Sequence, residues 1–320
     1  MERESRLLHT PESDVAILSP DRPRRLFAPG DILGDGADSP DEIYLFVAGS
    51  AVLGAETPFG PHPIATLGAP VLVNLKRALG GSTDLCRVVP DEESEAIVFT
   101  ADECCRLLSN PGQAGQAFRR LALSSVSTSL REANDALAQF FEPTGSKERR
   151  RPFLGIQPAP QGAERPAAPE MVYDLFDAAG LNPSGLPDLG LMARVLPEGT
   201  PLMTAGSYGD EAYLIAEGRL RVSIQIPGVG EEALAILGVG EIVGEMALID
   251  SAPRSADVYA HQGRAMVYVL SREVFRRLLE TGEGGGAPLL AGVTVVLTRR
   301  HEEAIRKAAG FRILAGPFGS

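Results

Sequence analysis

The feature that most constrains this chain is an internal repeat that is longer than the repeats of solenoid proteins. Residues 28–49 and 197–218 carry the same landmarks at the same spacing. The matching pairs, each 169 residues apart, are Gly30 with Gly199, Asp41 with Asp210 and Gly49 with Gly218. This register holds over about twenty residues without a gap, which chance similarity does not do. The sequence therefore predicts two copies of one domain.

The repeat continues beyond these landmarks. Residues 64–68 align with 235–238, residues 95–99 align with 264–268, and Arg-Leu-Leu recurs at 106–108 and 277–279. Between the copies, Pro143 to Pro169 contains six prolines together with Gly, Gln and Glu. This composition is typical of an extended linker. We therefore expect the chain to divide into a first domain at 1–142, a linker at 143–172 and a second domain at 173–320.

Each copy reads as a β-barrel followed by a long helix. Residues 42–47, 212–215 and 220–226 form short β-rich runs, which Gly and Pro turn signals separate at close spacing. That spacing is typical of an antiparallel barrel or jelly roll. The fold class expected is thus mainly β with α, namely two jelly-roll-like barrels, each with a long C-terminal helix.

The helix after the first barrel carries a heptad seam. Its apolar residues recur at steps of three and four: Leu123, Val126, Leu130, Ala133, Leu137 and Phe140. We expect this seam to hold a homodimer, with packing onto the neighbouring barrel as the alternative. A weaker seam in the second helix comprises Leu290, Val293, Leu297, Ala304 and Ala308, between Pro288 near its start and Gly310 at its end.

The segment richest in chemistry is 244–256, Gly-Glu-Met-Ala-Leu-Ile-Asp-Ser-Ala-Pro-Arg-Ser-Ala. It resembles the phosphate-binding cassette of the cyclic nucleotide-binding domain, whose pattern is Gly-Glu, a small residue and Leu, a short turn, then Pro-Arg, a small residue and Ala. Pro197 to Gly199 and Gly218 match further landmarks of that family, so the resemblance covers residues 189–309. It implies a ligand-binding barrel, which the family closes with its C-terminal helix.

The residue types suit a cyclic phosphate. The planar guanidinium of Arg254 can donate two parallel hydrogen bonds to a phosphate. The short turn from Ala247 to Ser251, which the family folds as one helical turn, would point free N–H groups at the same phosphate. Glu245 suits the ribose 2′-hydroxyl, because a carboxylate only accepts hydrogen bonds.

The resemblance and this chemistry together predict the ligand contacts. We expect them from Gly244, Glu245, Met246, Ala247, Arg254, Ser255 and Ala256, with Thr294, Thr298 and the neighbouring Arg299 as candidates for the helical cap. In the family, a threonine after the cassette arginine goes with cyclic GMP and an alanine with cyclic AMP. Ser255 can serve the phosphate instead, so cyclic AMP is the expected ligand and cyclic GMP the alternative.

The first copy departs from the cassette pattern at the positions of the Gly-Glu pair and of the arginine. Alignment of Ala78-Leu79 with Ala247-Leu248 puts Leu75-Lys76 at the Gly-Glu pair and Asp84, or its neighbour, at the arginine. A carboxylate there would repel a phosphate. We therefore expect one nucleotide site per chain and a first copy kept for structure or contacts.

Composition and charge exclude several other classes of function. The formal net charge is −12, which opposes nucleic-acid binding, and the sequence has no apolar run long enough for a membrane span. None of the four histidines lies at a spacing from a nucleophile or a metal-ligating residue that is typical of a catalytic or metal site. The three cysteines also lack the spacing of metal ligands. We expect a cytoplasmic protein with no catalytic site, no metal, no nucleic acid and no membrane contact.

The leading hypothesis is a non-enzymatic cyclic-nucleotide sensor that acts through protein contacts. Binding would reposition the C-terminal helix, and a protein partner, which the sequence does not identify, or the other barrel would respond. The alternative is a scaffold of two interaction modules with a vestigial site. The chain also resembles the cyclic AMP receptor protein, whose family carries a helix-turn-helix domain after the long helix. We expect no such domain here, because only ten residues follow Gly310. Inhibition of a protein kinase stays a minor option.

Overall fold

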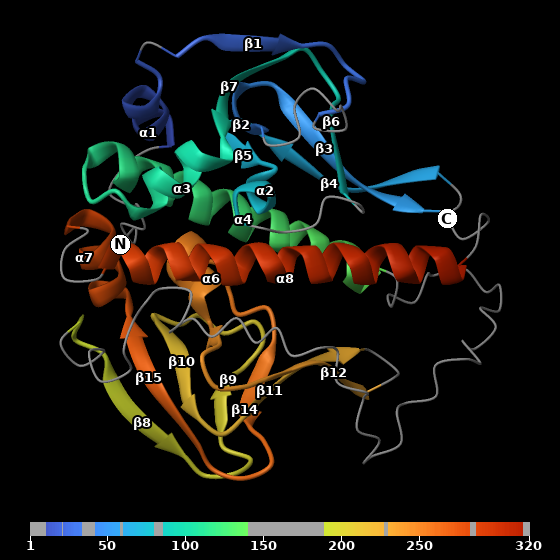
Figure 1. Ribbon diagram of the computed structural model, residues 1–320. Coiled ribbons are helices and arrows are strands. Elements are labelled where there is room, and N and C mark those ends of the chain that lie inside the picture. Colours follow the sequence, from blue (N-terminus) through green and yellow to red (C-terminus); the bar gives the residue numbers. More distant parts are fainter. Residues whose placement is uncertain are drawn as a thin grey trace, which may run out of the picture.

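The computed structural model describes residues 11–20, 22–33, 42–57, 60–79, 86–139, 189–226, 230–281 and 286–315. Within them the chain forms two β-barrels, which lie on opposite sides of a long helix (Figure 1). The expected linker at 143–172 falls outside the described residues, and the boundaries 1–142 and 173–320 stay predictions.

The first barrel consists of two antiparallel sheets, in the orders β1-β7-β2-β5 and β4-β3-β6. Its strands are β1 (Arg24–Phe27), β2 (Glu42–Ala48), β3 (Ser50–Thr57), β4 (Gly60–Gly68), β5 (Val71–Val73), β6 (Cys86–Pro90) and β7 (Ser94–Thr100). Its helices are α1 (Pro11–Leu18), α2 (Leu75–Ala78), α3 (Ala101–Ser109) and α4 (Gln113–Gln139). The central strand β2 buries Ile43, Tyr44, Leu45 and Phe46, so this barrel has its own apolar interior.

The second barrel repeats this arrangement, with sheets in the orders β13-β10-β15-β8 and β12-β11-β14-β9. Its strands are β8 (Met192–Leu196), β9 (Pro201–Met203), β10 (Glu211–Glu217), β11 (Leu220–Ile226), β12 (Gly230–Leu237), β13 (Ile242–Val243), β14 (Asp257–Ala260) and β15 (Ala265–Ser271). Its helices are α6 (Glu245–Asp250), α7 (Arg272–Thr281) and α8 (Gly286–Ala315). The prediction of two mainly β barrels, each followed by a long helix, is confirmed.

Strand pairing corrects one part of the predicted repeat. Phe46 pairs with Ala96 in the first barrel, and Ile215 pairs with Val267 in the second. Ala96 therefore corresponds to Val267, whereas the sequence alignment matched Ala96 with Ala265 and was wrong by two residues. A shift of two keeps every side chain on the same face of a strand, so the hydrophobic pattern alone could not detect it.

The two long helices pack against each other inside the chain. The described seam residues of α4, namely Leu123, Val126, Leu130 and Ala133, are at most 6% exposed. They belong to one apolar cluster with Leu290, Val293 and Leu297 of α8, and α4 also contacts β4, β5 and α6. The predicted use of this seam between two copies of the chain is therefore corrected, because its partner is the chain's own second helix. A homodimer through another surface stays a prediction.

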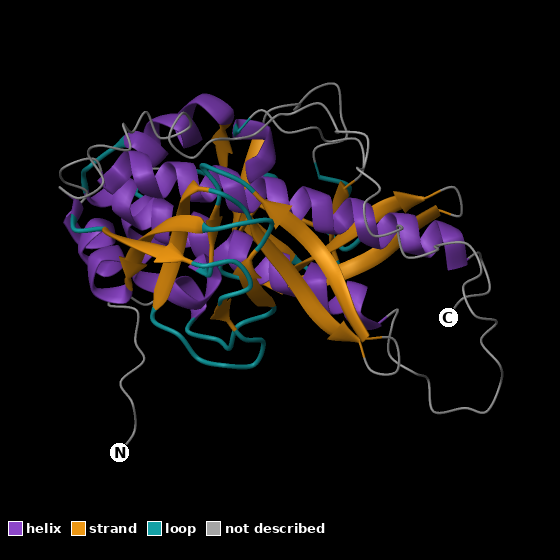
Figure 2. Cartoon of the chain, turned by 90° about the horizontal axis from the view of Figure 1, so that it is seen from below, coloured by secondary structure: helices purple, strands orange, loops and turns teal. Residues whose placement is uncertain are grey.

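Helix α8 is longer than the sequence indicated. The predicted end at Gly310 is wrong, because the helix continues to Ala315. A glycine inside a helix costs only about 1 kcal/mol relative to alanine, and the residues that follow are compatible with helix. In the view from below, the strands of the second barrel lie in front of the long helices (Figure 2). Among the helices that the structure describes, none is long and apolar enough to cross a membrane.

Replacement of Leu130 by alanine tests the packing of α4 against α8. The side chain is 4% exposed, so Leu130→Ala should lower the free energy of unfolding by about 2–5 kcal/mol. Chemical denaturation measures this loss. Glu132→Ala, on the exposed side of the same helix, should change the value by less than about 0.5 kcal/mol. A Leu130→Ala chain with unchanged stability but altered oligomeric state would place the seam between copies instead.

Candidate functional site

The segment singled out in the sequence forms a short helix and a turn between β13 and β14. Helix α6 spans Glu245–Asp250, as the predicted single helical turn requires, and Gly244 caps it with a φ of +83°. A Cβ atom at Gly244 would lie 2.5 Å from Arg254 Nη1 and 3.1 Å from the carbonyl oxygen of Glu211. Both the backbone angle and the lack of space therefore require glycine at this position.

The guanidinium of Arg254 lies against the backbone of the cassette. Its Nη1 donates to the carbonyl oxygen of Gly244 at 2.7 Å, and its Nη2 donates to that of Glu211 at 2.5 Å. On the other side, a Cβ atom at Gly209 would lie 2.4 Å from Nη2. Two glycines thus make room for a guanidinium that is almost fully enclosed.

Arg254 is a buried cation whose hydrogen-bond acceptors are backbone carbonyl groups. The residue is 7% exposed, and within the described part of the chain its side chain forms no ion pair with a carboxylate. Burial lowers the pKa of Arg254, which reflects the cost of removing its charge from water. An anion bound beside it would offset that cost. The site is therefore suited to a negatively charged ligand.

Glu245 has one oxygen bonded and one without a partner. The residue is 2% exposed, and its Oε1 accepts a hydrogen bond from Arg300 Nη1 at 2.9 Å. Arg300 Nη2 donates to the carbonyl oxygen of Ile242, so α8 is bonded to the start of the cassette. Oε2 is buried and has no hydrogen-bond partner. A carboxylate oxygen in this state can accept a hydrogen bond from a hydroxyl group of a ligand.

The end of α6 is held by the helix of the first barrel. Asp250 accepts hydrogen bonds from Ser127 Oγ at 3.1 Å and from Arg131 Nη2 at 2.9 Å. Arg131 Nη1 also donates to the carbonyl oxygen of Pro253 at 3.3 Å. Ser127 and Arg131 belong to α4, so the first half of the chain contacts the cassette of the second half directly.

A second arginine holds the middle of the cassette from α7. Arg272 donates to the carbonyl oxygens of Ala247 at 2.8 Å and Leu248 at 3.2 Å. It also pairs with Asp210 at 2.9 Å. A cation at the C-terminal end of a short helix stabilises carbonyl groups that have no partner within the helix. These bonds connect the cassette to α7 and to the loop before β10.

The structure brings most of the predicted site residues together and separates two of them. Gly244, Glu245, Met246, Ala247, Arg254 and Ala256 are adjacent in the cassette, and Ser255 is exposed beside them. Thr294 and Thr298 are buried, and their hydroxyl groups donate within α8, to Leu290 and Thr294 at 2.8 Å each. Thr298 also lines a cavity of the first barrel. The predicted capping role of these two threonines stays a prediction.

The sequence did not indicate six residues that contact the cassette or enclose Arg254: Gly209, Ser127, Arg131, Asp250, Arg272 and Arg300. Arg299, a predicted candidate for the cap, pairs with Glu303 at 3.8 Å, and its role in the cap stays a prediction. The next residue, Arg300, reaches the cassette, because adjacent helical residues point about 100° apart. Arg131 and Asp250 lie far apart in the sequence, and no local pattern links them.

The cassette of the first copy is also one residue out of the predicted register. Tyr44 pairs with Val73 as Tyr213 pairs with Val243, which makes Asn74 the counterpart of Gly244 and Leu75 that of Glu245. The alignment to Leu75-Lys76 was therefore wrong by one. Asn74 adopts a φ of +62° at the start of α2, a conformation that asparagine tolerates better than most residues. Asp84 lies outside the described residues.

Comparison with known proteins agrees with this geometry. Residues 193–281 match the family model of the cyclic nucleotide-binding domain. The cyclic AMP receptor protein of Thermus thermophilus is 36% identical over 112 residues, which are 35% of this chain and 49% of that protein. A regulatory subunit of cAMP-dependent protein kinase from Neurospora crassa is 34% identical over 97 residues, 28% of this chain and 25% of that protein.

The match to the family model lies within the second barrel, and the first barrel repeats the architecture of the second. Among solved structures, the regulatory domain of Toxoplasma gondii PKA with cAMP aligns over 86% of both chains, with 16% identity and a TM-score of 0.29. The chain spans half or less of the length of the two curated relatives described above.

Replacement of Arg300 tests the bond between α8 and the cassette. Arg300→Met leaves Glu245 buried without its partner and should lower the free energy of unfolding by about 3–5 kcal/mol. Arg276→Met removes an exposed pair with Glu280 and should cost less than about 1 kcal/mol. Both losses are measured by chemical denaturation. If the two variants were equally stable, the contact between Arg300 and Glu245 would contribute nothing to holding the helix.

Proposed function

We propose that the chain is a non-enzymatic, cyclic AMP-binding regulatory protein with one nucleotide site, in the second barrel. The observation that carries this proposal is the buried guanidinium of Arg254, which donates to two backbone carbonyl groups and forms no ion pair with a carboxylate in the described structure. A charge buried in this way is costly unless an anion binds it. The two curated relatives described above are named for cyclic AMP, which supports the same ligand.

Each part of the nucleotide has a proposed partner. Arg254 and the free N–H groups at the start of α6, beside Met246 and Ala247, would bind the cyclic phosphate. The unpaired Oε2 of Glu245 would accept a hydrogen bond from the ribose 2′-hydroxyl. Ser255 is exposed next to Arg254, and its hydroxyl can serve the phosphate. These contacts are common to cyclic AMP and cyclic GMP, and the names of the two curated relatives support cyclic AMP as the ligand.

The signal would pass through contacts that already exist. A nucleotide that engages Glu245 acts on Arg300 of α8, and a shift of α6 acts on Arg131 of α4 through Asp250. Since α4 packs against the first barrel and against α8, the first copy would respond to ligand bound in the second. We propose that this change is transmitted to a protein partner in the cytoplasm, with no nucleic acid involved.

One observation favours the alternative, a scaffold with a vestigial site. The side chains of Arg254, Glu245 and Arg272 all form hydrogen bonds within the chain, as a purely structural cassette would require. Binding groups held by such bonds are equally consistent with tight ligand binding, because they lose less conformational entropy on association. A direct binding measurement separates the two.

Titration calorimetry of the full chain with cyclic AMP and cyclic GMP tests the proposal. We expect one cyclic AMP per chain and weaker binding of cyclic GMP. Arg254→Ala removes charge-assisted hydrogen bonds worth about 1.5–3 kcal/mol each, so binding should weaken about tenfold or more. The control is Arg264→Ala, whose side chain is 76% exposed and pairs with Glu217. It should bind normally.

Three outcomes would contradict the proposal. Two cyclic AMP molecules per chain would show that the first copy also binds. Equal binding by the Arg254→Ala chain would remove the phosphate site from the cassette. No heat and no thermal stabilisation with either nucleotide would leave the scaffold as the better account, because a ligand that binds only the native state must raise its stability.

A further inference from the structure

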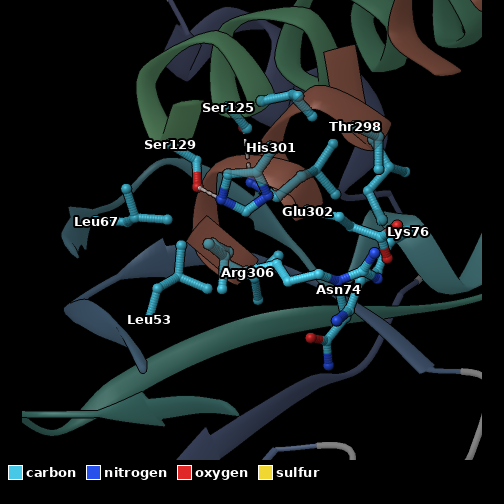
Figure 3. Close-up of a pocket in the computed structure, with 15 residues that line it drawn as sticks. Leu53, Leu67, Asn74, Lys76, Ser125, Ser129, Thr298, His301, Glu302 and Arg306 are labelled. Carbon is cyan, nitrogen blue, oxygen red and sulfur yellow. Dashed lines mark hydrogen bonds between the residues drawn. The ribbon is translucent and has the colours of Figure 1, made fainter. Parts of the chain in front are cut away.

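A cavity of about 60 Å³ lies between the first barrel, α4 and α8 (Figure 3). Its volume is several times the roughly 10–15 Å³ that one water needs. Leu53 and Leu67, on β3 and β4, form part of an apolar wall, and Asn74 and Lys76 of the first cassette line it as well. Arg306 of α8 lines the cavity and is exposed, so the cavity reaches the surface.

The polar groups in this cavity are not satisfied by the protein. Asn74 Nδ2 and Glu302 Oε1 are buried and have no hydrogen-bond partner. Lys76 is 9% exposed, and its ammonium group forms no ion pair in the described part of the chain. Buried donors and acceptors without partners cost about 1–3 kcal/mol each, and charged groups cost more. One donor and one acceptor without hydrogen bonds, and one cation without an ion pair at contact distance, therefore surround the same space in the described structure, and the charge of Lys76 acts on Glu302 electrostatically.

The side chain of His301 forms part of the cavity wall and carries no charge at pH 7. Its Nε2 lies 2.6 Å from Ser129 Oγ, a contact that joins α8 to α4 (Figure 3). Burial, with a smaller effect of Lys76, lowers the pKa of His301 to about 4, so the ring is neutral at pH 7. Burial also raises the pKa of Glu302. The cavity then has cations from Lys76 and Arg306 and an acidic group from Glu302.

We propose that this cavity is the enclosed part of a second binding site, for a small organic anion that also carries an N–H donor, such as an amino acid or a mononucleotide, whose remaining atoms would lie at the open side of the cavity beside Arg306. Lys76 and the amide of Asn74 would bind the carboxylate or phosphate, and Glu302 would accept a hydrogen bond from the N–H group. The leucines would cover the apolar body of the ligand.

The residues do not suit a cyclic nucleotide bound as in the second barrel. Leu75 stands where Glu245 stands in the second cassette, so no carboxylate is available at that position for a ribose hydroxyl. The carboxylate in this cavity comes instead from Glu302 of α8, which belongs to the other half of the chain. The proposed site therefore differs from the nucleotide site in its ligand groups and does not depend on the proposed function.

Thermal unfolding of the full chain in an Arg254→Ala background tests this site, because that variant weakens binding to the second barrel and the substitutions below assign any remaining effect to the cavity. The test ligands are 5′-AMP and phenylalanine, each of which has an anionic group and an N–H group. Inorganic phosphate and adenosine each have only one of the two features. We expect 5′-AMP or phenylalanine at millimolar concentration to raise Tm by about 2 °C or more, and the half-ligands to have less effect.

Two substitutions assign the effect to the cavity. Lys76→Met should weaken binding at least tenfold. Glu302→Gln keeps the side-chain shape and an acceptor oxygen but removes the negative charge, so it should weaken at least tenfold the binding of phenylalanine, whose N–H donor is a cationic ammonium group. Lys307→Met, on the exposed face of α8, is the matched control and should retain binding. The isosteric glutamine variant keeps the test valid should the methionine variant fail to fold.

The proposal fails if neither 5′-AMP nor phenylalanine raises Tm. It also fails if phosphate or adenosine alone gives the full effect, or if Lys76→Met and Glu302→Gln respond as the parent does. Binding of cyclic AMP to the unmodified chain tests the proposed function separately, so failure of one site leaves the other intact.

Discussion

The arrangement of this protein depends on the packing of α4 against α8. Both helices bury apolar faces in one cluster, with Leu130 on one side and Val293 and Leu297 on the other. Each helix follows one barrel and contacts the other half of the chain: α4 bonds to the cassette of the second barrel, and α8 contacts β3 and β4 of the first. This exchange makes the two barrels one structural unit (Figure 1).

Arginine side chains connect the candidate site to that unit. Arg300 of α8 bonds Glu245 at the start of α6, Arg131 of α4 bonds Asp250 at its end, and Arg272 of α7 bonds the carbonyl groups between them. Arg254 differs from Arg300 and Arg131, which bond carboxylates, because its enclosed guanidinium donates hydrogen bonds to carbonyl oxygens. A ligand that supplies the missing negative charge would therefore act on a cassette that three helices hold.

The sequence predicted the fold class and the residues of the cassette because both depend on local patterns. Glycines with positive φ, such as Gly244, and the short β-rich runs leave clear signals in one segment of chain. The use of the heptad seam was mispredicted, because an apolar stripe does not say whether its partner is another copy or a distant helix of the same chain. Arg131 and Asp250 were missed for the same reason, since only the tertiary fold brings them together.

The register between the two copies was the second feature that the sequence mispredicted. A shift of two residues in β15 preserves the inward and outward alternation, and a shift of one at Asn74 is hidden because asparagine replaces glycine at a positive φ. Arg300, which bonds Glu245, was missed on α8 because adjacent helical positions face different directions. Patterns define elements well, but hydrogen-bond pairing is needed to place side chains opposite one another.

We expect a ligand in the second barrel to act on the helix of the first through the bond between Asp250 and Arg131. Amide hydrogen exchange of the full chain, with and without cyclic AMP, measures this coupling, because exchange reports local stability along the chain. Exchange should change in α4 around residues 127–131 together with the change in the cassette at 244–256. A change confined to the second barrel and α8, with α4 unaffected, would contradict it.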